Sequence, residues 1–179
     1  MIKLGVAFGI AAAGPIGVGV LVGVAARDVL ELSGTTTGIV LFTGSMTALV
    51  LGPWWGRLLD RHGARNVGLV GIAVVTAVAG LPSLTTSALP FGLVWALIAG
   101  LIPLTIVVFQ SLGATLLPDN RGGALSFLLS FRFLGHAIGP LVFIPMIDSS
   151  VEAAFFLSAG LGVLTFLLVA SGLGRASST

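Results

Sequence analysis

The segment at residues 56–65, Gly-Arg-Leu-Leu-Asp-Arg-His-Gly-Ala-Arg, separates two apolar runs at residues 37–55 and 67–84. Each run is close to the roughly 20 apolar residues that an α-helix needs to cross the hydrocarbon core of a bilayer. The short polar stretch between the runs carries three arginines. The segment therefore predicts two membrane-spanning helices that are joined by a short basic turn.

Within this segment, Gly56 and Asp60 are one helical turn apart, so they share a face at the end of the first of these helices. Gly63 can adopt the left-handed conformation that ends a helix. A carboxylate at a helix C-terminus opposes the helix dipole. We therefore expect Asp60 to have a partner, which is Arg61, Arg65 or the N-terminus of another helix.

Four more apolar runs flank this pair, so the sequence predicts six membrane-spanning helices, at residues 4–26, 37–55, 67–84, 89–117, 123–147 and 153–173. A membrane β-barrel would instead show stretches of about ten residues that alternate between apolar and polar. We therefore predict an all-α integral membrane protein in which residues 1–179 form one domain. Pro103 lies within the fourth run and is expected to bend that helix.

The composition also predicts a lipid environment. Of the 179 residues, 56% are hydrophobic and 8% are charged, and the mean hydropathy is +1.17. A soluble domain carries roughly a quarter charged residues. This composition excludes a soluble enzyme, a disordered tail and a nucleic-acid-binding domain.

Enzymatic chemistry has little support in the sequence. There is no cysteine, which excludes disulfides and thiolate metal ligands. The Gly-x-Ser-x-Gly motif is absent, and His62 and His136 are expected at different depths, so no Ser/His pair is visible. We therefore expect no enzyme activity, no metal site and no cofactor.

Basic residues predict the orientation, because cytoplasmic loops of membrane proteins are enriched in Lys and Arg. With the N-terminus inside, only Arg27 lies on the outer side. The inner side then holds Lys3, Arg57, Arg61, Arg65, Arg121 and Arg175. We therefore predict a multi-pass protein of the cell membrane with both termini in the cytoplasm.

Polar side chains concentrate in the runs at 89–117 and 123–147, and those considered as substrate or coupling groups are Thr105, Gln110, Arg132 and His136. Arg132 lies eleven residues after Arg121, roughly 16 Å along a helix and near the bilayer midplane.

An Arg at this depth costs at least about 3 kcal/mol, and no acidic residue lies inside any of the six runs. The positive charge of Arg132 is then balanced by a group on another chain, by a substrate anion or by polar groups such as Gln110. Alternatively, Arg132 braces helix ends or extends to the interface. His136 is either a proton carrier or a neutral packed side chain, and the hydroxyls either face a cavity or bond to their own helix.

Glycine is abundant, with 26 residues. Several glycines are spaced four residues apart, which lets two helices approach closely. Because so many glycines produce some pairs by chance, the prediction of close contacts depends on pairs beside other unusual residues rather than on those in the first run. The pairs are Gly5 and Gly9, Gly19 and Gly23, Gly52 and Gly56, Gly92 with Ala96 and Gly100, and Gly135 and Gly139.

The pattern Gly-x-x-x-Asp-Arg-x-Gly-x-Arg between two apolar helices resembles the loop motif of the major facilitator superfamily of secondary transporters, found between the second and third helices of each six-helix half. The matching residues are Gly56, Asp60, Arg61, Gly63 and Arg65. Ala64 stands where the family often has a basic residue. In the family, the acid makes an interdomain contact that keeps the cytoplasmic side closed. The resemblance therefore implies that Asp60 is a gating residue.

A second motif, Gly135-x-x-x-Gly139-Pro140, resembles the Gly/Pro motif in the fifth helix of many antiporters of this superfamily and its analogue in the eleventh helix. The glycine pair that commonly follows in the fifth-helix version is missing here, since Leu141 and Val142 come next. This departure favours the carboxy-terminal half.

The resemblance spans the whole chain and implies one six-helix half of a transporter, whose substrate path lies between two halves. Such a half is a fragment of a longer protein or pairs with a second half, and moves a small solute by alternating access. Helices one and four would line the path, two and five would flank it, and three and six would meet lipid. The alternative is a non-transporting membrane protein, an assembly partner or degenerate half, which is favoured by the lack of an intramembrane carboxylate.

Overall fold

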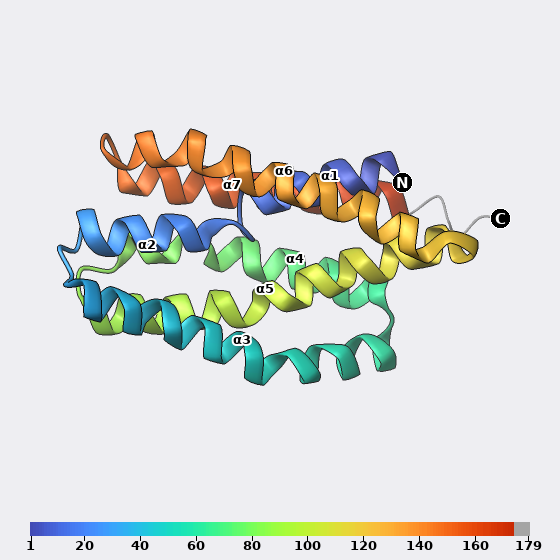
Figure 1. The fold of residues 1–179 in the computed structure, drawn as a ribbon, viewed down its shortest axis with the longest axis horizontal. Helices are drawn as coiled ribbons and strands as arrows, with labels where there is room; N and C mark the ends of the chain where they lie inside the picture. Colours follow the sequence, from blue (N-terminus) through green and yellow to red (C-terminus); the bar gives the residue numbers. More distant parts are fainter. Residues whose placement is uncertain (174–179) are drawn as a thin grey trace.

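The computed structural model describes residues 1–173, with side chains up to Ser171, and this part of the chain is a bundle of long helices (Figure 1). The elements in chain order are α1 (Ile2–Ala13), α2 (Val18–Asp28), α3 (Gly34–His62), α4 (Ala64–Val78), the 3-10 helix η1 (Leu81–Leu84), α5 (Ala88–Leu116), the 3-10 helix η2 (Pro118–Asn120), α6 (Arg121–Ile147) and α7 (Val151–Leu173). Six candidate spans are long and apolar enough to cross a membrane. The predicted all-α membrane class is therefore confirmed.

The first span differs from the predicted continuous helix at residues 4–26, because it is divided into α1 and α2. Pro15 has no backbone N–H, and it is flanked by Gly14 and by Gly17 two residues later. The Ile16 N–H donates to the Ala11 carbonyl, five residues back, at 2.9 Å. By contrast, α5 continues through Pro103 without a break.

The second span is longer than predicted, because α3 continues to His62. Gly56 and Asp60 therefore lie on the last turns of a helix, and only Gly63 separates α3 from α4. Gly63 has a φ of 78°, as expected for a glycine that ends a helix, and its N–H donates to the Leu59 carbonyl at 2.8 Å. Ser33 caps the other end of α3 by accepting from the Thr36 N–H at 3.1 Å.

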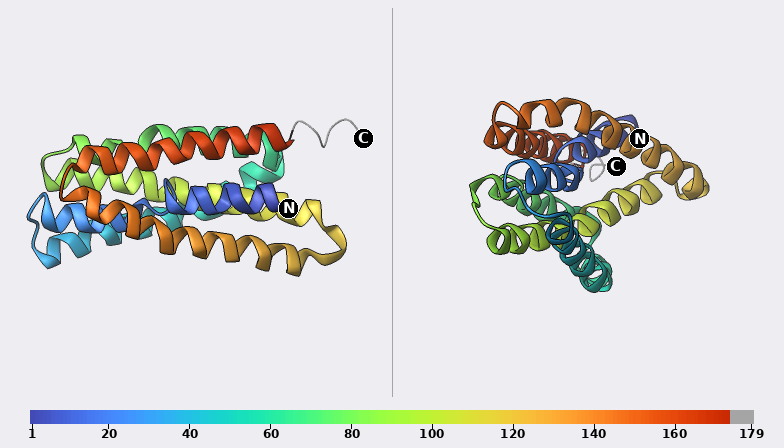
Figure 2. Two further views of the ribbon diagram at one scale, coloured as in Figure 1. Left: turned by 90° about the horizontal axis from the view of Figure 1, so that it is seen from above. Right: turned by 60° about the vertical axis from the view of Figure 1, so that its left-hand side comes forward.

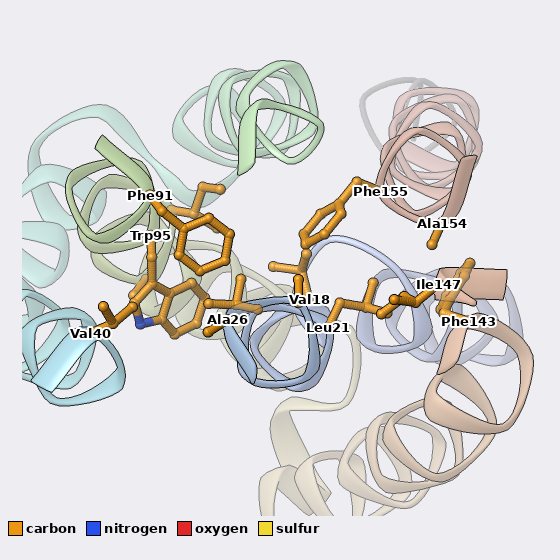
Figure 3. Close-up of a cluster of buried hydrophobic side chains, with 14 of the residues drawn as sticks. Val18, Leu21, Ala26, Val40, Phe91, Trp95, Phe143, Ile147, Ala154 and Phe155 are labelled. Carbon is orange, nitrogen blue, oxygen red and sulfur yellow. The ribbon is translucent and has the colours of Figure 1, made fainter. Parts of the chain in front are cut away.

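The closest helix pairs are α3 with α5, and α1 with α6 (Figure 2). The largest core cluster joins α2, α3, α4, α5, α6 and α7, and includes Val18, Phe91, Trp95 and Phe155 (Figure 3). Trp95 of α5 is buried against two glycines on neighbouring helices. A Cβ at Gly19 of α2 would lie 2.9 Å from its ring, and a Cβ at Gly44 of α3 would collide with Nε1.

Charged residues gather at the two ends of the bundle. The N-terminus and the end of α7 lie at one end (Figure 1). That end also has the α3–α4 and α5–α6 connections, and most of the arginines lie in the helix turns beside them, at Arg57, Arg61, Arg65 and Arg121. The opposite end contains Arg27, Asp28, Glu31, Asp148 and Glu152. Arg175, which the sequence analysis assigned to the inner side, lies outside the described residues.

Candidate functional site

The Gly/Pro motif of α6 packs directly on the backbone of α1. A Cβ at Gly135 would collide with the Gly9 carbonyl oxygen and would lie 2.9 Å from the Gly9 carbonyl carbon. A Cβ at Gly139 would lie 2.6 Å from the Ala13 carbonyl oxygen. Pro140 follows within the continuous helix. The motif therefore brings α6 into close contact with the end of α1, immediately before the break in the first span.

The other glycine pairs have different surroundings from those expected. Gly5 and Gly9, in the first run, do lie at a close contact, because a Cβ at either would be within 3.1 Å of Phe131. Gly52 and Gly56 have no atom within 4 Å of a built Cβ, so they face open space. The prediction that the first-run pairs are weak evidence for close contacts is therefore wrong for Gly5 and Gly9. Four-residue spacing does not reveal which face of a helix has a neighbouring helix.

The polar candidates of α6 lie away from every acid in the described residues, since these acids are all at helix ends or in turns. The Arg132 Nε is buried without a hydrogen-bond partner. Its guanidinium carbon lies 5.8 Å from the centroid of the Phe133 ring, within cation–π range. His136 is one turn further along the helix and is also partly buried. Arg132 therefore provides a cation within the membrane span whose acidic partner is not in residues 1–173.

The two candidates on α5 differ in exposure. Gln110 is partly exposed. Thr105 is only 1% exposed, and its hydroxyl has no hydrogen-bond partner among the described residues. Gln110 is therefore partly accessible at the surface of the bundle, whereas Thr105 is enclosed.

The segment at residues 56–65 lies at the end of the bundle, where Leu59 is buried and the charged side chains are exposed. Asp60, Arg61 and Arg65 are exposed, and no described residue forms an ion pair with Asp60 by the usual 4 Å criterion. Directly before Gly56 in the sequence, Trp55 fixes the α3–α5 contact, because its Nε1 donates to the Gly100 carbonyl at 2.6 Å. A Cβ at Gly100 would meet the Leu51 and Thr47 side chains within 2.9 Å. The expected local partner of Asp60 is thus not found in residues 1–173, although the helix that carries it is anchored.

Burial is uneven among the six spans. Only 17% of the most apolar stretch of α3 and 22% of that of α6 is buried, against 61% for the α1–α2 span and 50% for α5. Figure 2 shows α3 and α6 at the periphery of the bundle. The two helices that carry the two motifs therefore leave most of their apolar surface uncovered.

Comparisons with known proteins find one family and several relatives to which this chain is similar. The sequence pattern described as Major Facilitator Superfamily matches residues 4–178. The chain is 28% identical over 141 residues to "Uncharacterized MFS-type transporter YuxJ" of Bacillus subtilis (strain 168), covering 75% of this chain and 33% of the relative. It is 31% identical over 137 residues to "Multidrug resistance protein MdtG" of Enterobacter lignolyticus (strain SCF1), covering 74% and 32%.

The MdtG protein of Serratia proteamaculans (strain 568) is 29% identical, with the same coverage of 74% and 32%. The chain thus spans about a third of the length of the curated relatives that it matches. No solved structure matches.

Proposed function

The chain belongs to the major facilitator superfamily, and on that premise we propose that it is one six-helix half of a secondary transporter that moves a small solute across the cell membrane by alternating access. The family and the relatives support a transport role in general. The observation that carries the half-transporter proposal is the uncovered surface of α3 and α6, the two least buried spans. In this superfamily a second half covers the corresponding helices.

The second half is either part of the same chain in a longer protein or a separate subunit. Gly52 and Gly56 offer it a surface without side chains on α3, so that another helix can approach closely there. The curated relatives are about three times as long as the part that this chain matches, so a protein of their length has room for a second half. The Gly/Pro motif of α6 favours assignment of this chain to the carboxy-terminal position.

The gate in this proposal is the segment with Gly56, Asp60, Arg61, Gly63 and Arg65. Asp60 is exposed at the end of an anchored helix. Contact of its carboxylate with the second half would keep the inner side closed, and loss of that contact would open it. The end of the bundle with the N-terminus faces the cytoplasm, because most of the basic residues lie there.

The substrate path in this proposal includes Arg132, His136 and Gln110, which are partly exposed. Thr105 reaches the path when movement of α5 exposes its hydroxyl. Burial of a cation inside a membrane span is costly, so a role for Arg132 in binding or coupling explains its position better than packing alone.

The experiment is dye flux in membrane vesicles from cells that produce this chain with and without a second six-helix half. Ethidium and fluorescein serve as cationic and anionic probes. Flux is expected only when both halves are present, and Arg132→Gln is expected to abolish it without lowering the abundance of the protein in the membrane. Arg121→Gln, at the start of the same helix, is the matched control.

Unchanged flux in the Arg132→Gln variant would remove Arg132 from the substrate path. If the two halves form a complex but move neither dye, the result favours the other function class, a non-transporting assembly partner.

A further inference from the structure

A cavity of about 260 Å³ lies at the end of the bundle away from the N-terminus, where α2, η1, α5 and α7 meet. None of the residues of the two motifs, and none of the polar candidates on α5 and α6, lines it. Its volume is below the roughly 300–1,000 Å³ of pockets that hold drug-sized ligands. The cavity is therefore a separate space, suited to a compact solute or to one group of a larger molecule.

Two aromatic rings form the apolar side of this cavity. Phe91 of α5 and Phe155 of α7 line it, and both are almost completely buried, with exposures of 1% and 0%. Figure 3 shows the two rings reaching toward α2 from their separate helices, within the main core cluster. The two rings are therefore covered and form a fixed base for the apolar side, whereas Val29, Leu30 and Val151 also line the cavity and are at least partly exposed, so that they can contact an alkyl chain.

The polar side of the cavity consists mainly of hydrogen-bond acceptors. The Ser83 hydroxyl donates to the Gly80 carbonyl at 2.8 Å, and the Thr85 hydroxyl donates to the Pro82 carbonyl at 2.8 Å. Because each hydroxyl has one proton, what these two groups can offer a ligand is their remaining lone pairs.

Glu152 adds a carboxylate to the lining of the cavity. One of its oxygens, Oε2, accepts from the Ser150 hydroxyl at 3.0 Å, which leaves the other oxygen for a ligand. Thr86 also lines the cavity. Its hydroxyl forms no hydrogen bond with the described residues, so this hydroxyl can donate to a ligand as well as accept from it.

The charged residues near the cavity are mostly acidic. Asp28, Glu31 and Asp148 lie at the same end of the bundle as Glu152. The basic residue at this end among the described residues is Arg27, and its guanidinium donates to the Leu32 carbonyl at 2.8 Å. The negative potential at this end attracts cations.

We propose that this cavity binds the primary ammonium group of an alkylamine. Glu152 is the counter-ion, the hydroxyl oxygens of Ser83 and Thr85 accept from the ammonium, and Val29, Leu30 and Val151 contact the alkyl chain. Such a group is found on free amines and on the ethanolamine headgroup of lipids, and the cavity recognises the chemistry that they share. The site is independent of the transport path proposed above.

The test is equilibrium binding of tritiated hexylammonium to the purified 179-residue chain in phosphatidylcholine nanodiscs. Saturable binding is expected, with an affinity about fivefold lower for Glu152→Gln, because an ion pair with a solvent-accessible carboxylate contributes up to about 1 kcal/mol. Asp148→Asn, which removes the same charge at the same end but outside the cavity lining, is expected to lower the affinity less than Glu152→Gln does. Ser83→Ala, which removes one acceptor, is a second variant and is expected to lower the affinity about threefold.

Competition then identifies the chemistry. Hexyltrimethylammonium, which has no N–H, is expected to compete more weakly than hexylammonium, and hexanoate is expected not to compete. Nanodiscs that contain phosphatidylethanolamine distinguish a lipid headgroup from a free amine as the occupant. A lower apparent affinity for hexylammonium in these nanodiscs identifies the lipid headgroup, and an unchanged affinity identifies a free amine. Equal binding by the unchanged protein, Glu152→Gln and Ser83→Ala, or equal competition by hexanoate, would overturn the proposal.

Discussion

Replacement of Gly135 by Ala is expected to destabilise the fold, although the same change at most helix positions is favourable. Ala has a higher helix propensity than Gly by about 1 kcal/mol. At position 135, however, the added Cβ would collide with the Gly9 carbonyl and lie 3.0 Å from the Ala12 Cβ. The colliding atoms belong to the backbone of α1, so no side chain can rotate away from the new methyl group.

Overpacking of this kind costs about 1–3 kcal/mol. After subtraction of the helix-propensity gain, we expect Gly135→Ala to lower the free energy of unfolding by up to about 2 kcal/mol. Gly160→Ala on α7 is the matched control, because nothing lies within 4 Å of a Cβ at that position. This control is expected to keep or raise the stability by up to about 1 kcal/mol.

The assay is unfolding of the purified chain with increasing SDS in mild detergent micelles, followed by circular dichroism. The two variants should shift the transition in opposite directions. If both shift it equally, or if Gly135→Ala is the more stable variant, the contact between α1 and α6 is not as close as described, and the reasoning fails.

Two other substitutions test the α3 connections in the same SDS assay. Gly63→Ala is expected to lower the free energy of unfolding by about 1–3 kcal/mol, because a residue with a side chain is strained at a φ of 78°. Gly122→Ala, at an open position, should have little effect, and similar shifts for the two variants would contradict this explanation. Trp55→Phe is expected to cost about 1 kcal/mol through loss of the hydrogen bond to the Gly100 carbonyl, and the exposed neighbour Trp54→Phe should be nearly neutral; a larger loss for Trp54→Phe would show that this bond does not anchor α3.

The sequence predicted the fold class and the number of spans because the length of an apolar run is a local property. It did not predict the break between α1 and α2. Pro15, Pro103 and Pro140 look alike in the sequence, but only the first is followed by a break, where Gly14 and Gly17 flank it. The effect of a proline in a membrane helix depends on its neighbours and on the helices packed against it.

For the candidate site, the sequence predicted which residues take part but not which other residues they contact. The four-residue spacing of Gly52 and Gly56 is the same as that of Gly5 and Gly9, but only the second pair contacts another helix in the described residues. The sequence did not predict the end cavity, because Ser83 and Thr85 lie between α4 and α5 whereas Glu152 lies at the start of α7, and the two regions are adjacent only in the folded chain. No short motif in the sequence identifies such an arrangement.

The break in the first span has a consequence for the order of assembly. α1 has 12 residues and α2 has 11, so each is roughly 17 Å long, about half the thickness of the hydrocarbon core, and the two must enter the membrane as one unit. The surfaces that pack on α1 belong to α6 and α7. They are synthesised more than 100 residues later. The first helix to enter the bilayer is therefore among the last to acquire its native neighbours, and a chain that stops after α5 would leave the Gly9 backbone facing lipid.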